Sequence, residues 1–435
     1  MGLKDFFRNR WTKFTIWALL YLAWVVWMGS YWWLLGLIVI FDIFITRKVH
    51  WNFWKKRYKP GEKHSAANDW LDTIIFVIIV VPLINIFLFQ AFKIPSSSME
   101  RTLYTGDHLF VSKLTYGPRL PETPLTIPFT HNTIFGKESY STLIQNKYRR
   151  LKGFREVRRG DCVVFGFPNG DTVLRSAPAE DYYALVRILG RETVEGLGET
   201  IVRPTDKKDH YVKRCVALPG DTLEVRDGLV WVNGEQQEVY PGIQLSYAVK
   251  TNGQKINSKT VEELGLNPSE LYFNPAMPGY PAMLLTAEAL EKVKALPNVV
   301  EVRDNLDRDP SACRLEIFPY TVDSGWTRDY YGPLWIPSRG ATVKLTEENL
   351  PLYERIISVY EKSDLSKAIA DGEYTFKQDY YFMMGDNRHN SLDSRYWGFV
   401  PEDHIVGKPV VIWLSTDKNQ KFPKNIRWDR FLKFL

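Results

Sequence analysis

Two long apolar segments near the start of the chain constrain its folding most, because segments of this kind are stable only in a bilayer or in a large protein core. The first covers residues 14–46 and has one charged residue, Asp42. The second covers residues 71–92. Each is at least as long as the ~20 residues with which a helix crosses a bilayer. The sequence therefore predicts an N-terminal membrane anchor, and the few charges argue against the alternative of a buried helical core.

The first apolar segment allows two arrangements. A turn at Gly29-Ser30 would give a transmembrane hairpin of two short helices, whereas a continuous segment would give one long tilted helix. A basic tail at residues 1–13 and a basic loop at residues 47–70 flank it. Basic flanks favour the cytoplasmic side, so an even number of crossings is expected. This favours the hairpin, although each arm has only about 15 residues, which is short for a full span.

The second apolar segment, residues 71–92, is predicted to be a single transmembrane helix that leads out of the cytoplasm. Pro82 and Asn85 interrupt it, which transmembrane helices tolerate. Everything after residue 92 is then expected on the extracytoplasmic side. No small-residue cleavage site follows the first apolar segment, so a cleaved signal peptide is not predicted.

The rest of the chain has the pattern of a mostly β domain, with short β-branched runs separated by turn residues. These runs cover residues 108–114, 162–167, 211–218, 222–234, 379–385 and 408–414. We expect them to form one β catalytic domain from residues 93–240 and 373–435. Residues 241–372 contain helical patterns among loops and are predicted to form an inserted α+β subdomain, whose role the sequence does not indicate.

Charge and cysteine content exclude several classes of function. The net charge of +6 is spread along the chain, and no zinc-finger or RNA-binding pattern is present, so no nucleic-acid partner is expected. The three cysteines, Cys162, Cys215 and Cys313, form no CxxC pair. No metal site and no cofactor are therefore predicted. The odd number leaves at least one thiol free or paired between chains, and the disulfide state stays open.

A serine-rich turn, IPSSSMERTLYTGD at residues 94–107, directly follows the second apolar segment. Turns of this kind often cap a helix or serve as a linker. Pro95 stiffens this one, and Met99 and Leu103 supply apolar anchors, so it is not a typical linker. A serine nucleophile there would need a base. The histidines nearest to the other motifs are His210, His389 and His404, and none lies in an obvious catalytic pattern.

Lys213 is the alternative base. Strand alternation places it on the same face as Tyr211 and Cys215, with Arg214 on the opposite face. A lysine on a buried face is costly unless it is neutral or paired. Desolvation lowers the pKa of such a lysine towards neutrality, which suits a general base. The competing interpretation is a lysine on a solvated strand face.

Three segments together closely resemble the conserved boxes of bacterial type I signal peptidases (leader peptidases). They are residues 94–107, YVKRCVALPGD at 211–221 and GDNRHNSLDSRYWGFVPEDHIVGK at 385–408, in family order. A fourth segment, RGDCVVF at 159–165, resembles a strand box of the family. The resemblance implies a signal-peptidase-like β fold with long insertions. It also implies a membrane-bound serine endopeptidase that removes N-terminal signal peptides from preproteins after small residues.

The resemblance also implies roles for single residues. Ser98 corresponds to the nucleophile and Lys213 to the general base of a Ser-Lys dyad that acts through an acyl-enzyme. Ser96 and the backbone N–H of Ser98 correspond to the oxyanion hole, and Ser391 to the residue that orients the lysine. The remaining implied residues are the structural ion network of Asp393, Arg395 and Arg214, and the substrate-pocket walls Ile94, Pro95 and Val212.

The chain departs from the family pattern in three places. Ser97 occupies a position that is often Gly, and His389 stands where the family commonly has Asp, which puts the local charge network in question. Insertions at residues 117–155 and 168–209 lengthen the separation between Ser98 and Lys213.

Two other functions compete with signal-peptide removal. A self-cleaving repressor of the same superfold would be soluble, and the apolar segments argue against it. A membrane-anchored inactive homologue or scaffold would lack part of a motif, and none is missing. The expected partners are preprotein signal peptides and the lipid bilayer, and the expected location is the bacterial cytoplasmic (inner) membrane, as a multi-pass protein. The preproteins cut and the oligomeric state stay open.

Overall fold

A computed structural model describes residues 9–49, 51, 65–254, 256–257, 260–261, 264, 272–273, 281–313, 315–321, 324–418 and 420–435. Residues 1–8 of the predicted basic tail and residues 52–64 of the predicted basic loop lie outside the described residues, as does the side chain of Cys313. Cys162 and Cys215 are free thiols.

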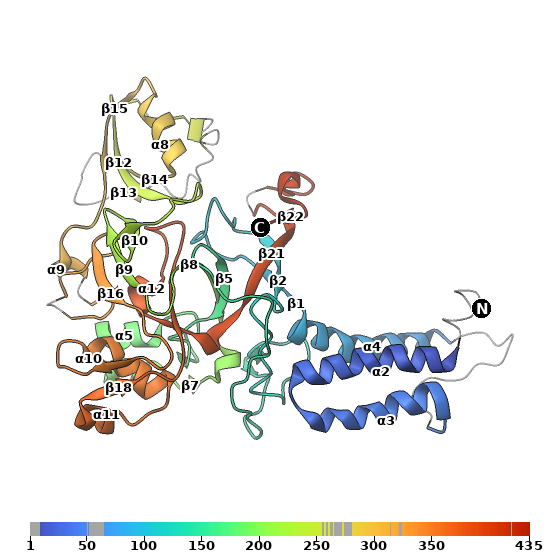
Figure 1. Cartoon of the computed structure of the whole chain (residues 1–435). Coiled ribbons are helices and arrows are strands. Elements are labelled where there is room, and N and C mark those ends of the chain that lie inside the picture. The colour runs from blue at the N-terminus through green and yellow to red at the C-terminus, as the bar shows by residue number, and fades with distance from the viewer. Residues whose placement is uncertain are drawn as a thin grey trace.

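The first apolar segment folds into two helical arms. Helix α2 (Arg10–Met28) ends at Gly29, whose φ of 58° is the left-handed conformation that glycine adopts without strain. The chain then returns beside α2 as η1 (Tyr31–Leu35), α3 (Gly36–Phe41) and η2 (Asp42–Thr46), as Figure 1 shows. The rings of Phe14 and Phe41 lie 5.4 Å apart across the two arms. The structure therefore has a break at Gly29 instead of one continuous helix.

The second apolar segment forms α4 (Ala66–Phe87), which continues through Pro82. Within the described residues, α2 and α4 are the helices long and apolar enough to cross a membrane. Helix α4 ends at Phe87 and not at residue 92, because β1 (Phe89–Lys93) pairs with β2 (Asp107–Ser112). This pairing satisfies backbone groups that a continued helix would have used, and it starts the β domain directly at the end of α4.

The main sheet joins strands that are far apart in the sequence, in the order β1-β2-β21-β5-β8-β19-β20, with β22 also on β21. Their pairings are antiparallel. Figure 1 shows that the sheet is curled. The bounds not yet given are β5 (Cys162–Gly166), β8 (His210–Ala217), β19 (Tyr380–Met384), β20 (Val400–Pro401), β21 (Ile405–Ser415) and β22 (Lys433–Phe434).

The second sheet has the order β11-β10-β9-β16. Strands β9 (Thr222–Arg226) and β10 (Leu229–Val232) form a hairpin through Asp227-Gly228, where both residues have positive φ, as a tight two-residue turn requires. Its outer strands are β11 (Glu235–Gln236) and β16 (Tyr331–Trp335). Helices α10 (Leu350–Arg355), η6 (Ile356–Tyr360) and α11 (Leu365–Asp371) contribute to the same buried cluster as this sheet.

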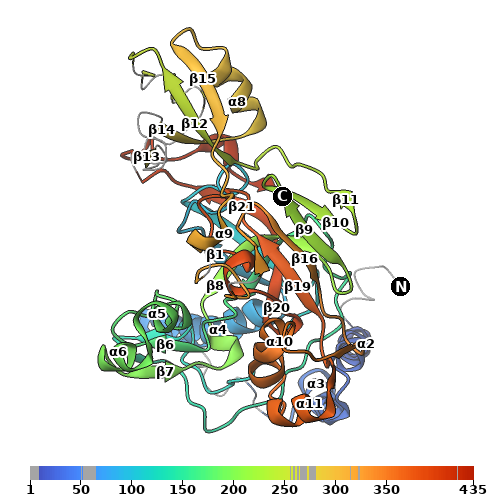
Figure 2. The ribbon, with the colours of Figure 1, turned by 90° about the vertical axis from the view of Figure 1, so that its left-hand side faces the viewer.

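A third sheet, β13-β14-β12-β15, has its own core with α8 (Ala287–Lys294), and it projects from the rest of the chain in Figure 1 and Figure 2. Its strands are β12 (Leu245–Thr251), β13 (Tyr272–Phe273), β14 (Pro281–Leu285) and β15 (Val299–Asp304). We call this unit the inserted sheet. Within predicted subdomain 241–372, strands β12 to β15 thus form a separate sheet, whereas β16 joins β9.

Shorter elements complete the described fold. They are β3 (Thr133–Ile134), β4 (Lys137–Glu138), β6 (Thr172–Leu174), α5 (Tyr182–Leu189), α6 (Arg191–Gly196), β7 (Thr200–Val202), η3 (Thr205–Lys207), α9 (Pro310–Cys313), β17 (Thr342–Lys344), β18 (Glu373–Thr375), α12 (Ser394–Trp397), η7 (Glu402–His404) and η8 (Trp428–Arg430). The prediction of a mostly β domain behind apolar N-terminal helices is confirmed.

Candidate active site

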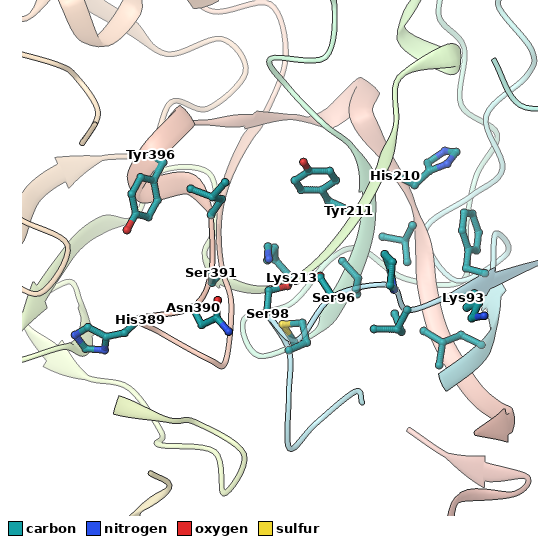
Figure 3. A pocket seen from close by; sticks show the side chains of 18 residues that line it. Lys93, Ser96, Ser98, His210, Tyr211, Lys213, His389, Asn390, Ser391 and Tyr396 are labelled. Atoms are coloured by element: carbon teal, nitrogen blue, oxygen red, sulfur yellow. Dashed lines mark hydrogen bonds between the residues drawn. The ribbon is translucent and has the colours of Figure 1, made fainter. Parts of the chain in front are cut away.

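A cavity of about 510 Å³ lies between the turn after β1, strand β8 and the loop after β19. Figure 3 shows its lining side chains. Three motifs meet there, although each is more than a hundred residues from the next along the chain. They meet because β2, β21, β5, β8 and β19 are neighbours in one sheet. Seven of the predicted site residues line the cavity: Ile94, Pro95, Ser96, Ser98, Val212, Lys213 and Ser391.

The turn that carries Ser98 is anchored from below. Met99 and Leu103 are fully buried in the core beneath it, as their apolar character predicts. Ile94 N–H donates to the Asp107 carbonyl at 2.9 Å and closes the base of the turn. Ser98 is half-buried, and its Oγ lies 3.5 Å from the Oγ of Ser96. The two hydroxyls therefore lie side by side at the cavity wall, at the outer limit of hydrogen-bond distance.

Lys213 enters the cavity from β8, where it lies opposite Val163 of β5. It is only 3% exposed. Burial lowers the pKa of its ammonium group to about 8, against a smaller opposing effect of the Asp393 carboxylate. Figure 3 shows its side chain beside Ser98 and Ser391. The neutral form of Lys213 is therefore far more populated near pH 7 than that of an ordinary lysine, with its pKa of about 10.4.

The loop after β19 brings Ser391 to the same place. Its hydroxyl is buried and has no hydrogen-bond partner among the described residues. Gly385 makes the approach possible, since a Cβ at this position would lie 2.2 Å from Ser391 Oγ and 2.6 Å from the Ser98 carbonyl oxygen. Asn387, which sequence reasoning missed, donates its N–H to that same carbonyl at 3.1 Å.

The three predicted ion-network residues form two separate pairs. Arg395 and Asp393 are fully buried and share two hydrogen bonds of 2.8 Å. Arg214 instead pairs with Asp386, with Nε 2.7 Å from Oδ1. No role for Asp386 was predicted from the sequence. Strand alternation places Arg214 on the face of β8 away from Lys213, so Arg214 needs a carboxylate partner on that face.

His389, the residue that departs from the family pattern, has a defined environment. Its ring is fully buried, and Nε2 lies 2.9 Å from Asp329 Oδ2. The backbone N–H of Ser246 donates to Nδ1 at 3.2 Å. No sequence signal pointed to Asp329, which lies in an irregular stretch before β16.

Comparison with known proteins assigns the family. The profile of the family described as signal peptidase, peptidase S26, matches residues 67–273 and 339–414. The chain belongs to this family. Relatives named signal peptidase I include one from Haemophilus influenzae, 27% identical over 379 residues (85% of this chain and 76% of the relative). Another is from Helicobacter pylori (strain J99), 25% identical over 387 residues, with 85% and 92% covered. The resemblance recognised from the sequence is therefore confirmed.

The histidines of this S26 peptidase are placed differently from Lys213. His210 lines the cavity, but its ring packs on His131 with centroids 4.4 Å apart, and burial lowers its pKa well below the usual value. His404 lies outside the cavity and bonds Lys208 and Asp403. Among the described residues, no hydrogen bond joins Ser98 Oγ to a histidine or to Lys213, so the choice of base rests on burial and on position in the cavity.

We expect Asp393→Ala to destabilise the peptidase, because it leaves the fully buried Arg395 without its carboxylate. Removing one partner of a buried ion pair typically lowers the free energy of unfolding by about 3–5 kcal/mol. Thermal unfolding would measure the change. Glu288→Ala, which opens an exposed pair with Lys292, should leave the melting temperature nearly unchanged. Equal melting temperatures for both variants would contradict the role of the Asp393–Arg395 pair.

Proposed function

We propose that this peptidase is a membrane-bound serine endopeptidase that removes N-terminal signal peptides from preproteins, with Ser98 as nucleophile and Lys213 as general base. The observation that carries the proposal is the buried Lys213, with a pKa of about 8, in the same cavity as Ser98. The relatives named signal peptidase I support the substrate class.

The chemistry follows from these two side chains. Neutral Lys213 accepts the proton of Ser98 while Oγ attacks the scissile carbonyl, and it then donates that proton to the leaving amine. An acyl ester on Ser98 remains, and water deprotonated by Lys213 hydrolyses it. Ser96 and the N–H of Ser98 donate to the oxyanion, with a contribution on the order of 3 kcal/mol per donor. The unpartnered hydroxyl of Ser391 is available to orient the Lys213 ammonium.

The cavity walls account for a preference for small residues. Ile94 is almost fully buried, and the 94–107 turn holds it in place. Val212 directly precedes the general base on β8. We infer that, with Pro95, they bound pockets too small for a large side chain, which would overlap wall atoms of a packed core.

The apolar helices support membrane attachment with the catalytic domain outside the cytoplasm. The return at Gly29 brings the chain back to the side of the basic loop, and α4 then crosses once. Because β1 begins two residues after α4, the active site lies close to the outer surface of the bilayer. The location proposed is the bacterial cytoplasmic (inner) membrane, as a multi-pass protein.

The test uses the purified full chain in detergent with an exported preprotein. We expect one cut, after a small residue, identified by mass spectrometry of the products. A matched preprotein with large residues at both pocket positions should be cleaved about 10- to 200-fold more slowly, the range that pocket size typically gives. Equal rates would refute the pocket assignment, and no cleavage of either preprotein would favour the inactive-scaffold alternative.

A further inference from the structure

The loop of residues 385–391 is bonded on one side to the nucleophile turn. Asn387 N–H donates to the Ser98 carbonyl at 3.1 Å, and its side-chain Nδ2 donates to the Ser97 carbonyl at 3.2 Å. Asn390 Nδ2 donates to Ser97 Oγ at 2.9 Å. The position of the nucleophile therefore depends on where this loop is held.

The other side of the same loop is bonded to the root of the inserted sheet. Gln244, directly before β12, donates its N–H to the Asp386 carbonyl at 2.8 Å. Its own carbonyl accepts from Arg388 N–H at 3.1 Å. Its side-chain Nε2 donates to the Leu284 carbonyl of β14 at 3.1 Å. The loop thus lies between the inserted sheet and the nucleophile turn.

His389 makes the side-chain contacts that complete this arrangement. Because Ser246 N–H donates to Nδ1, the neutral ring carries its proton on Nε2 and donates it to Asp329. Both ring nitrogens therefore make hydrogen bonds: Nδ1 with Ser246 of β12, and Nε2 with Asp329 in the segment before β16. Asp329 Oδ2 also accepts Asp307 N–H at 2.8 Å, which fixes the carboxylate.

The surroundings of the ring favour its neutral form. Burial lowers the pKa of His389, the Asp329 carboxylate opposes this, and Arg328 and Arg395 lower the pKa further. Protonation would place an Nδ1–H against Ser246 N–H, so the neutral form is the one that fits both partners.

We propose that His389 is a positioning residue that fixes the 385–391 loop to Ser246 and Asp329, and through that loop holds Ser391 and the Ser98 turn in place. The inference rests on the proposed function of Ser98 and Lys213. It gives the inserted sheet a role as rigid support of the active site, since catalytic side chains need supporting residues whose own positions are fixed.

The expected result for His389→Ala is a fall in kcat of about 10-fold or more with a smaller change in KM, because a misplacement of ~1 Å can cost ~100-fold. A loosened loop also admits water to Lys213, whose charged neighbours are Asp393, Arg395 and Asp386. Weaker desolvation raises its pKa, so the acid limb of the kcat/KM profile should move to higher pH. A loss of folded protein alone would lower the amount of active enzyme without moving this limb.

Four further variants separate the contacts. His389→Gln can still donate to Asp329, and His389→Asn can still accept from Ser246, so each should recover part of the lost kcat. Asp329→Ala should resemble His389→Ala. The double variant should have a kcat little lower than either single variant, since both substitutions remove the same His389–Asp329 contact. Val194→Ala, in the separate buried cluster of β6, α5 and α6, is the control and should leave kcat and the acid limb unchanged.

The proposed function is checked separately by cleavage with the wild type and its loss in Ser98→Ala. Given that result, unchanged kcat and an unchanged acid limb in His389→Ala and Asp329→Ala would overturn the inference. If His389→Ala does not fold, wild-type kcat and pH profile in both the Gln and Asn variants would overturn it equally. An equal loss in Val194→Ala would also overturn it, because general loosening would then explain the effect.

Discussion

Ser98→Ala is expected to abolish preprotein cleavage, with kcat lowered by at least ~10³-fold, because no other group at this position can form the acyl ester. Binding should persist, since the pocket walls and the Ser98 backbone remain. Cleavage kinetics in detergent would measure kcat, and co-purification with an uncleaved preprotein would report binding. Residual cleavage within about 10-fold of wild type would show that the nucleophile is a different residue.

Ser97→Ala is the matched control for this variant. Ser97 is the neighbouring hydroxyl, and it accepts one hydrogen bond from Asn390 outside the proposed dyad. Losing one neutral hydrogen bond costs about 1 kcal/mol, so activity should fall by no more than about fivefold. If Ser97→Ala were as inactive as Ser98→Ala, the assignment within the serine triplet would be wrong.

Lys213→Met should be as inactive as Ser98→Ala, since it keeps the volume of the side chain and removes the base, and residues that act as a unit are lost together. In the wild type, kcat/KM should fall about tenfold per pH unit below the pKa of about 8. The direction follows from the chemistry: protonated Lys213 cannot accept the Ser98 proton. A pH series of initial rates would measure this limb.

Lys208→Met is the control for the pH effect. Lys208 is also buried, and burial likewise lowers its pKa to about 8, but it does not line the cavity. Its replacement should leave the acid limb at the same pH. Retained activity in Lys213→Met would indicate a histidine base, and His210 and His389 are the histidines that line the cavity.

Local patterns predicted the main strands correctly because their cues lie within a few residues. Alternation in YVKRCVAL placed Lys213 and Arg214 on opposite faces of β8, which pairs with β5 through both residues. The end of α4 was placed five residues too late, because the apolar residues of β1 look like a continuation of the helix. Only the pairing of β1 with β2 distinguishes a strand from a continued helix here, and that pairing joins residues that are distant in the sequence.

The sequence by itself determined the apolar N-terminal segments, the β domain and the identity of Ser98 and Lys213 as candidates, since these follow from composition, alternation and motifs. The tertiary structure decided the partners. Arg214 pairs with Asp386, and His389 with Asp329 and Ser246, because long-range packing and not spacing sets which buried charges meet. The desolvation of Lys213 is likewise a tertiary property, as the low pKa comes from residues folded over it from several strands and loops.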